Sequence, residues 1–261
     1  MKIDENQVEQ IRLLMSTYQD GTGQLRIKNG AILPNWRDFE RSVATTFDGF
    51  AFENKGFLDV VINGVEIKEN GKIGISCKMR NTLSAFKTSK SISMELSNAL
   101  NKFWSELQKY KIHHMGHVRL VPDRAGKIIV DLYESWKYQV AGKNEVNMEK
   151  SFYLTCLYDG KKGLYQLFAL PFLLPDAASL VWEIRESKEK DENKGTLIAK
   201  KDDKVIIEWY GTSGGQLKYY PTEDDVIWKS NEFKLEPIPN IESGYGLKQK
   251  AKLYFPNKWK F

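Results

Sequence analysis

The sequence predicts an α/β (α+β) protein with a mixed central β-sheet flanked by helices. Apolar residues recur at helical spacing in two N-terminal segments, and later segments read as short apolar strands. The 261 residues are 41% hydrophobic, which suffices for a sizeable core. No repeat or linker tract marks a boundary, so we expect one globular body.

The N-terminal third contains two predicted helices. In Val8–Tyr18 the apolar residues fall on one helical face, and Gly21-Thr22-Gly23 ends the segment. A second amphipathic segment, Trp36–Phe47, follows Pro34-Asn35. Glu40 lies beside its apolar stripe, so we expect it at the edge of a buried surface.

A β-meander is predicted next. The apolar run Phe57–Ile62, the segment Val65–Lys68 and the segment Lys72–Lys78 are separated by two Asn-Gly pairs. Asn-Gly favours the positive φ angles of tight hairpin turns.

One long helix, Ile92–Tyr110, is then expected, followed by strands at Val118–Val121 and Ile128–Tyr133. This order of strands and helix is typical of a mixed sheet with a helix packed on it. The remaining predicted strands are Phe152–Tyr158, Tyr165–Leu170, Leu180–Ile184, Val205–Tyr210 and Gln216–Tyr220.

Composition points to a soluble cytoplasmic protein. No apolar run approaches the ~20 residues that span a bilayer, and Met1–Asn6 has no signal-peptide character, so we expect no membrane contact. The two cysteines, Cys77 and Cys156, form no disulfide framework or zinc motif.

The net charge is +5, and the basic residues are unevenly distributed. Gly71–Met94 has five bases and no acid, and Lys248–Phe261 has five lysines among aromatic residues. Such segments suit phosphate neutralisation and base stacking, and they equally suit a solvated surface. The candidate DNA contacts are Arg80, Lys87 and Lys90, with Gln216 and Lys218 as candidates for reading base edges.

Asp59 is the only charged residue in its apolar strand, and a buried carboxylate needs a cation, a proton or several donors. Lys78 lies at the end of a neighbouring strand, on the same face as Ser76. An acid and a lysine so placed can hold a divalent cation and position a water beside a phosphate. Mg²⁺ requires further oxygen ligands, and Glu95, beside the apolar stripe of the expected helix, is the candidate second acid.

These residues resemble the PD-(D/E)XK nuclease superfamily, and in particular type II restriction endonucleases. Leu58 stands where the motif has proline, and Ser76 stands where it has an acid. Ser76-Cys77-Lys78 is similar to the triplet of the subgroup that cuts sites with a CCGG core, in which a glutamate of the next helix replaces the missing acid. Glu95 would be that glutamate.

The resemblance implies a restriction-endonuclease-like core and roles for the site residues. Asp59 and Glu95 would bind Mg²⁺, with the Cys77 carbonyl as a further ligand. Lys78 would orient and activate water, and Glu40 would support the site from the preceding helix. We therefore expect a nuclease core over residues 1–150 and a β-rich DNA-contacting part of the same body over residues 151–261. The expected partners are double-stranded DNA and further copies of the chain, in a homodimer or a tetramer.

Several alternatives stay open. Glu66-Ile67-Lys68 reads as a literal ExK motif and competes with Ser76-Cys77-Lys78. Asp59 and Lys78 also suit an ordinary salt bridge without catalysis. At the level of function, the alternatives are a non-catalytic nucleic-acid-binding protein and a repair or recombination nuclease of the same fold.

Overall fold

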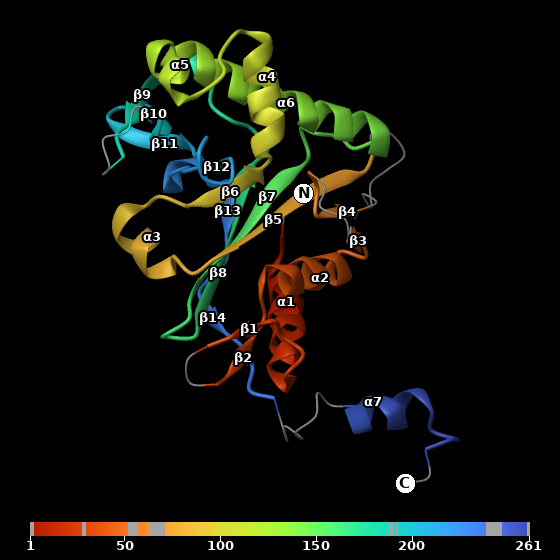
Figure 1. The fold of residues 1–261 in the computed structure, drawn as a ribbon. Helices are drawn as coiled ribbons and strands as arrows, with labels where there is room; N and C mark the ends of the chain where they lie inside the picture. The colour runs from red at the N-terminus through yellow and green to blue at the C-terminus, as the bar shows by residue number, and fades with distance from the viewer. Residues whose placement is uncertain are drawn as a thin grey trace.

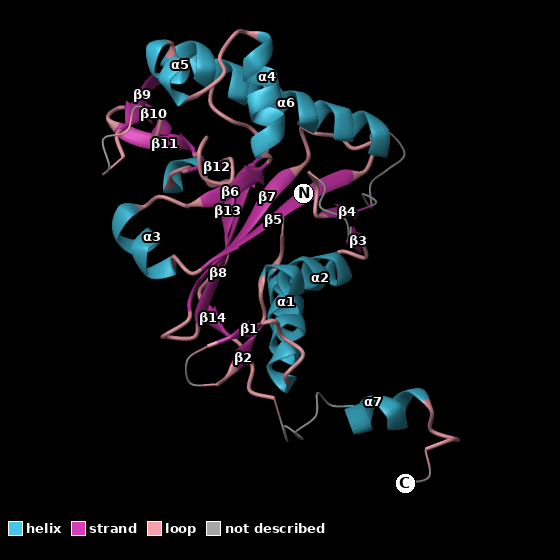
Figure 2. Cartoon of the chain, in the orientation of Figure 1, coloured by secondary structure: helices cyan, strands magenta, loops and turns pink. Residues whose placement is uncertain are grey.

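The computed structural model describes residues 3–27, 30–51, 57–62, 71–187, 191, 193–238 and 247–259. It confirms an α+β architecture in which parallel and antiparallel strands share one sheet (Figures 1 and 2). Val65–Lys68, and with it Glu66-Ile67-Lys68, lies outside the described residues.

The N-terminal helices form as predicted, and each begins at a capping box, at Asp4 and at Asn35. This part of the chain contains α1 (Glu5–Thr17), a 3₁₀ turn (Tyr18–Asp20), β1 (Leu25–Arg26), β2 (Ile32–Leu33) and α2 (Trp36–Thr46).

The larger sheet has seven strands in the order β13-β8-β7-β5-β4-β3, with β14 also pairing with β8. β5 and β7 are parallel, and the other pairs of this sheet are antiparallel. Its strands are β3 (Phe50–Ala51), β4 (Val60–Ile62), β5 (Ile73–Arg80), β7 (Phe152–Asp159), β8 (Leu164–Pro171), β13 (Trp228–Lys229) and β14 (Phe233–Lys234).

The second sheet is antiparallel, in the order β6-β12-β11-β10-β9. Its strands are β6 (Met94–Asn98), β9 (Val181–Arg185), β10 (Thr196–Lys201), β11 (Lys204–Trp209) and β12 (Gln216–Tyr219). Both sheets therefore combine strands from before and after residue 150, and the functional division there stays a prediction.

The remaining helices lie between or beside the sheets. They are α3 (Leu83–Ser89), α4 (Leu100–Lys109), α5 (Met115–Leu120), α6 (Pro122–Asn144) and α7 (Leu247–Tyr254), with 3₁₀ turns at Ala177–Ser179 and Glu223–Asp225. Among the described helices, none is long and apolar enough to cross a lipid bilayer.

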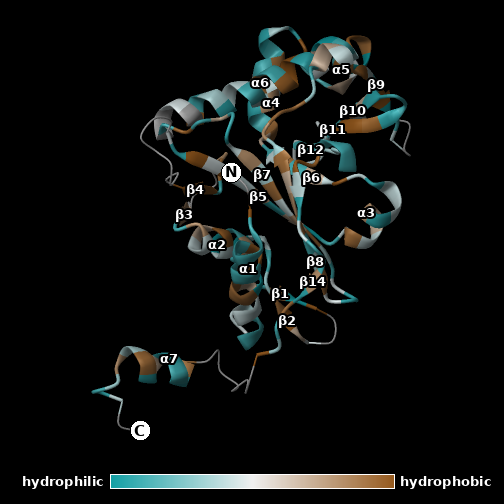
Figure 3. Cartoon of the chain, turned by 180° about the vertical axis from the view of Figure 1, so that it is seen from behind, coloured by the Kyte–Doolittle hydropathy of each residue, from teal (hydrophilic) through white to brown (hydrophobic). Residues whose placement is uncertain are grey.

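Two hydrophobic clusters cover opposite faces of the larger sheet. Helices α1 and α2 pack on one face through residues such as Met15 and Phe39. Helices α3 to α6 pack with the other face and with the smaller sheet, where Phe103 and Trp209 are fully buried. Figure 3, coloured by hydropathy, shows hydrophobic residues along the central strands β5 and β7.

The long helix expected over Ile92–Tyr110 is wrong in its first third. Met94–Asn98 is strand β6, and the helix α4 begins only at Leu100. β6 is antiparallel to β12, with Glu95 opposite Lys218. Pairing with a distant strand has overridden the local helical periodicity.

The strands expected at Val118–Val121 and Ile128–Tyr133 are also wrong. Met115–Leu120 forms α5, and α6 extends over Pro122–Asn144. Pro122 is the first residue of α6, a position that suits proline because its missing N–H needs no helical partner. The other predicted strands from Phe152 onward are confirmed, and β10, β13 and β14 are additional ones.

Gly126 lets α6 pack closely on β9. A Cβ atom there would lie 2.2 Å from the Trp182 ring, whereas one at Gly142 of the same helix would meet nothing within 4 Å. We expect Gly126→Ala to destabilise the fold by about 1–3 kcal/mol through overpacking. Gly142→Ala, the matched control, should stabilise it by about 1 kcal/mol through helix propensity. Thermal unfolding of both variants tests this, and equal shifts would contradict it.

Candidate active site

Asp59 lies immediately before β4 and faces β5. Its Oδ2 accepts hydrogen bonds from Ser76 Oγ (3.1 Å), the Cys77 backbone N–H (2.8 Å) and Lys78 Nζ (3.4 Å). The side chains of Asp59 and Lys78 are each 18% exposed. The prediction that Lys78 partners this carboxylate is confirmed, and an ordinary salt bridge would show the same contact.

The alternation along β5 sets which groups reach this carboxylate. Ser76 and Lys78 both turn their side chains to Asp59. The Cys77 side chain points into the opposite cluster, beneath α1 and α2. Burial, and next the charge of Asp59, raises the pKa of the Cys77 thiol well above its ordinary value, so this thiol stays protonated.

Glu40 approaches Asp59 from α2. It is 3% exposed and pairs with Arg37 at 3.0 Å, one helical turn away. Burial, followed by the negative charge of Asp59, raises the pKa of Glu40 to about 7. The positive charges of Arg37 and Lys78 lower the pKa of Glu40 in turn. The charge state of Glu40 therefore depends on Asp59 and on both cations.

The raised pKa of Glu40 predicts a pH-dependent stability. Between its ordinary pKa of 4.5 and about 7, the folded protein binds more protons at Glu40 than the unfolded chain does. The free energy of unfolding therefore falls as pH rises through this window. Glu40→Gln removes the titration, so its melting temperature relative to the parent should rise between pH 5 and pH 8. Thermal unfolding in chelator measures this, and a constant difference would contradict it.

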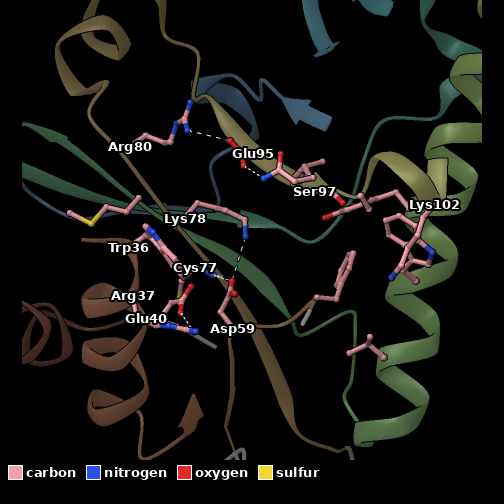
Figure 4. Close-up of a pocket in the computed structure, with 18 of the residues that line it drawn as sticks. Trp36, Arg37, Glu40, Asp59, Cys77, Lys78, Arg80, Glu95, Ser97 and Lys102 are labelled. Atoms are coloured by element: carbon pink, nitrogen blue, oxygen red, sulfur yellow. Dashed lines mark hydrogen bonds and ion pairs between the residues drawn. The ribbon is translucent and has the colours of Figure 1, made fainter. Parts of the chain in front are cut away.

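Glu95 lies on strand β6, not on a helix as predicted. Its carboxylate pairs with Arg80 at 3.6 Å and accepts a hydrogen bond from Gln216 Nε2 at 3.0 Å, and Asn98 also donates to it. Figure 4 shows Glu95 across the pocket from Asp59, with Lys78 between them. Glu40 is thus the second carboxylate close enough to act on Asp59. Glu95 instead pairs with Arg80 and Gln216.

The other predicted DNA contacts already have partners in the structure. Two of these lysines form ion pairs with glutamates, and the third lies against an aromatic ring. Lys87 pairs with Glu232 at 2.6 Å, and Lys90 pairs with Glu223 at 3.1 Å. Lys218 Nζ lies 4.4 Å from the centroid of the Tyr210 ring. Lys87 and Lys90 remain candidate phosphate contacts, and Lys218 remains a candidate for reading base edges.

A cavity of about 790 Å³ contains the Asp59 cluster and extends to α6. Its lining includes charged and aromatic side chains. The charged ones include Glu40, Asp59, Lys78, Arg80, Glu95 and Lys102, and the aromatic ones are Trp36, Phe57, Tyr133 and Trp136. The residues that α4 and α6 contribute to this lining, Lys102, Tyr133 and Trp136, are not among the predicted site residues. Ala125, Ile129, Leu132, Trp136 and Val140 are spaced as one helical face and would have placed Trp136 on a helix.

The donor set fits a magnesium ion. Among the described residues, no group of three or more histidine, cysteine, aspartate or glutamate side chains is arranged to hold a metal. Mg²⁺, however, is commonly held by one or two carboxylates together with water and substrate phosphate. The three hydrogen bonds that described residues make to Asp59 all end on Oδ2, and Glu40 carries a carboxyl whose ionisation a cation would favour.

Comparisons with protein-family models, with curated proteins and with solved structures each found no match to this chain.

Proposed function

We propose that this protein is a Mg²⁺-dependent DNA endonuclease of the type II restriction class. The observation that carries the proposal is the contact of Lys78 with Asp59 at 3.4 Å, with the buried Glu40 beside them, in one cavity. The resemblance of Asp59 and Ser76-Cys77-Lys78 to the PD-(D/E)XK motif supports it. The pairing of β4, which Asp59 immediately precedes, with β5, which carries the triplet, supports it as well.

In this mechanism Asp59 and Glu40 would hold a magnesium ion. Such an ion would supply charge neutralisation at the scissile phosphate and would lower the pKa of a water molecule. Lys78 orients the attacking water and stabilises the negative charge that develops on the phosphate. The water oxygen forms the new bond to phosphorus, the ester bond to the sugar oxygen breaks, and that oxygen takes up a proton.

The scaffold accounts for the geometry of the reacting groups. Asp59 N–H donates to the Ile75 carbonyl at 3.0 Å, and Ser76 and the Cys77 N–H fix the carboxylate. Ser76 is therefore a positioning residue in this proposal and not a ligand. A homodimer on double-stranded DNA would present one such site to each strand.

The proposal is tested by incubating the protein with a long plasmid. We expect discrete fragments with Mg²⁺, and binding without turnover in Ca²⁺, whose longer and looser coordination misaligns the water. Cleavage at full rate in chelator would contradict the metal mechanism. A smear of products would favour a repair or recombination nuclease, and binding without any cleavage would favour a non-catalytic DNA-binding protein.

A further inference from the structure

The cavity has two chemically different ends. Asp59, Lys78 and Glu40 form a charged end beside β4 and β5, and Phe57, Tyr133 and Trp136 form an aromatic end beside α6. The nuclease chemistry proposed above uses only the charged end. The aromatic end needs a separate explanation because Phe57 and Trp136 are only partly buried. Tyr133 is buried in the core and packs against both rings from behind.

The aromatic rings are held in place from behind. Phe57 packs against Tyr133, with ring centroids 4.8 Å apart, and against Phe172, at 5.4 Å. Trp136 packs against Phe103 at 5.2 Å. The Tyr133 hydroxyl is hydrogen-bonded to the Tyr153 hydroxyl at 3.0 Å. These contacts keep the rings from collapsing into the cavity, so a flat ligand would meet a preformed surface.

A cation accompanies the aromatic surface. Lys102 Nζ of α4 lies 5.2 Å from the Trp136 ring centroid and lines the same cavity. Figure 4 shows Lys102 beside α6, on the far side of the cavity from Glu40. A cation beside a ring suits a ligand that has both a planar aromatic part and a phosphate.

The two ends are close enough for one ligand. Phe57 lies two residues before Asp59 in the chain, and both residues line the cavity. The cavity of about 790 Å³ falls within the roughly 300–1,000 Å³ typical of small-molecule sites. It can admit a single nucleotide, whereas the stacked bases of an intact duplex present no free ring face to it.

We infer that the aromatic end binds one unstacked nucleobase next to the phosphate that lies between Asp59 and Lys78. The inference rests on the proposed function and narrows its substrate to DNA from which one nucleotide leaves the base stack. Trp136 and Phe57 would stack on the base, and Lys102 would move from the Trp136 ring to a neighbouring phosphate.

Equilibrium binding in Ca²⁺ tests the inference without relying on catalysis. The probes are a fluorescein-labelled DNA duplex of about two dozen base pairs and the same duplex with one unpaired adenine at its centre. We expect the parent protein to bind the bulged duplex about tenfold more tightly. Trp136→Leu, which keeps apolar volume without a stacking face, should abolish that preference, and Trp136→Phe should retain most of it.

The matched control is Tyr138→Leu. Tyr138 lies on the same helix, is 65% exposed and lies outside the cavity lining, so its loss should leave the preference unchanged. Equal binding of both duplexes by the parent protein would overturn the inference, and so would an undiminished preference in Trp136→Leu. Plasmid cleavage in Mg²⁺ tests the nuclease proposal separately. The Trp136-dependent preference can be observed in a protein that does not cleave DNA, and cleavage can be observed in a protein without that preference.

Discussion

Replacing Lys78 by alanine is expected to lower the rate of DNA cleavage by about 10²- to 10⁴-fold. The reason is that Lys78 Nζ is the cationic group in contact with the Asp59 carboxylate, and it lines the cavity in which the phosphate would lie. DNA binding in Ca²⁺ should change little, because one charge contributes a small part of a multi-phosphate contact. Single-turnover cleavage and a gel-shift titration measure the two effects.

Lys127→Ala is the matched control for this variant. Lys127 is an exposed lysine of α6 that pairs with Asp131 at 2.8 Å, remote from the cavity lining. Its replacement should leave cleavage unchanged. If Lys78→Ala cuts DNA at the parental rate, the contact with Asp59 is an ordinary salt bridge and the catalytic assignment fails.

Glu40→Gln is expected to reduce cleavage by more than about 100-fold, and Glu95→Gln by less than tenfold. The difference follows from position: Glu40 is buried in the field of Asp59, whereas Glu95 already pairs with Arg80 and Gln216. Cleavage rates at saturating Mg²⁺ measure this contrast. The control is Glu106→Gln on α4, because Glu106 pairs with Lys109 and lies outside the cavity lining.

Other outcomes for these variants would assign the second acid to a different glutamate. An inactive Glu95→Gln beside an active Glu40→Gln would make Glu95 the second acid, as the sequence resemblance implies. An inactive but folded Glu66→Ala would instead favour Glu66-Ile67-Lys68 as the catalytic triplet. Asp59→Asn should be inactive under every one of these assignments.

Local sequence pattern was sufficient to predict the part of the site that is built from residues close together in the sequence. Asp59 immediately precedes β4, and Lys78 lies on β5, the antiparallel neighbour of β4. Side-chain alternation along β5 predicts that Lys78 shares a face with Ser76. Glu40 was predicted at the border of a buried helical face, and the helix places it there. These inferences needed only periodicity and the cost of burying a charge.

The rest of the site depends on long-range pairing that periodicity cannot reveal. Ile92, Leu96 and Phe103 share a helical spacing, yet β6 extends through Glu95 because it hydrogen-bonds to β12, far along the chain. Tyr133 and Trp136 were missed for a different reason. The apolar run at Ile128–Tyr133 was interpreted as a strand, although Pro122 and the spacing beyond it are typical of a helix.

The parallel pairing of β5 with β7 has a consequence for the assembly of the strand that carries Lys78. Ile75 lies opposite Phe152, so the strand that carries Lys78 gains one of its two neighbours only after α3 to α6 have been synthesised. Contacts of such sequence separation form slowly, because the intervening loop must first be closed. A fragment that stops at residue 150 would leave the backbone groups of β5 open along that edge, where a second chain can pair with them. Self-association, and not an isolated working nuclease core, is therefore the expected behaviour of that fragment.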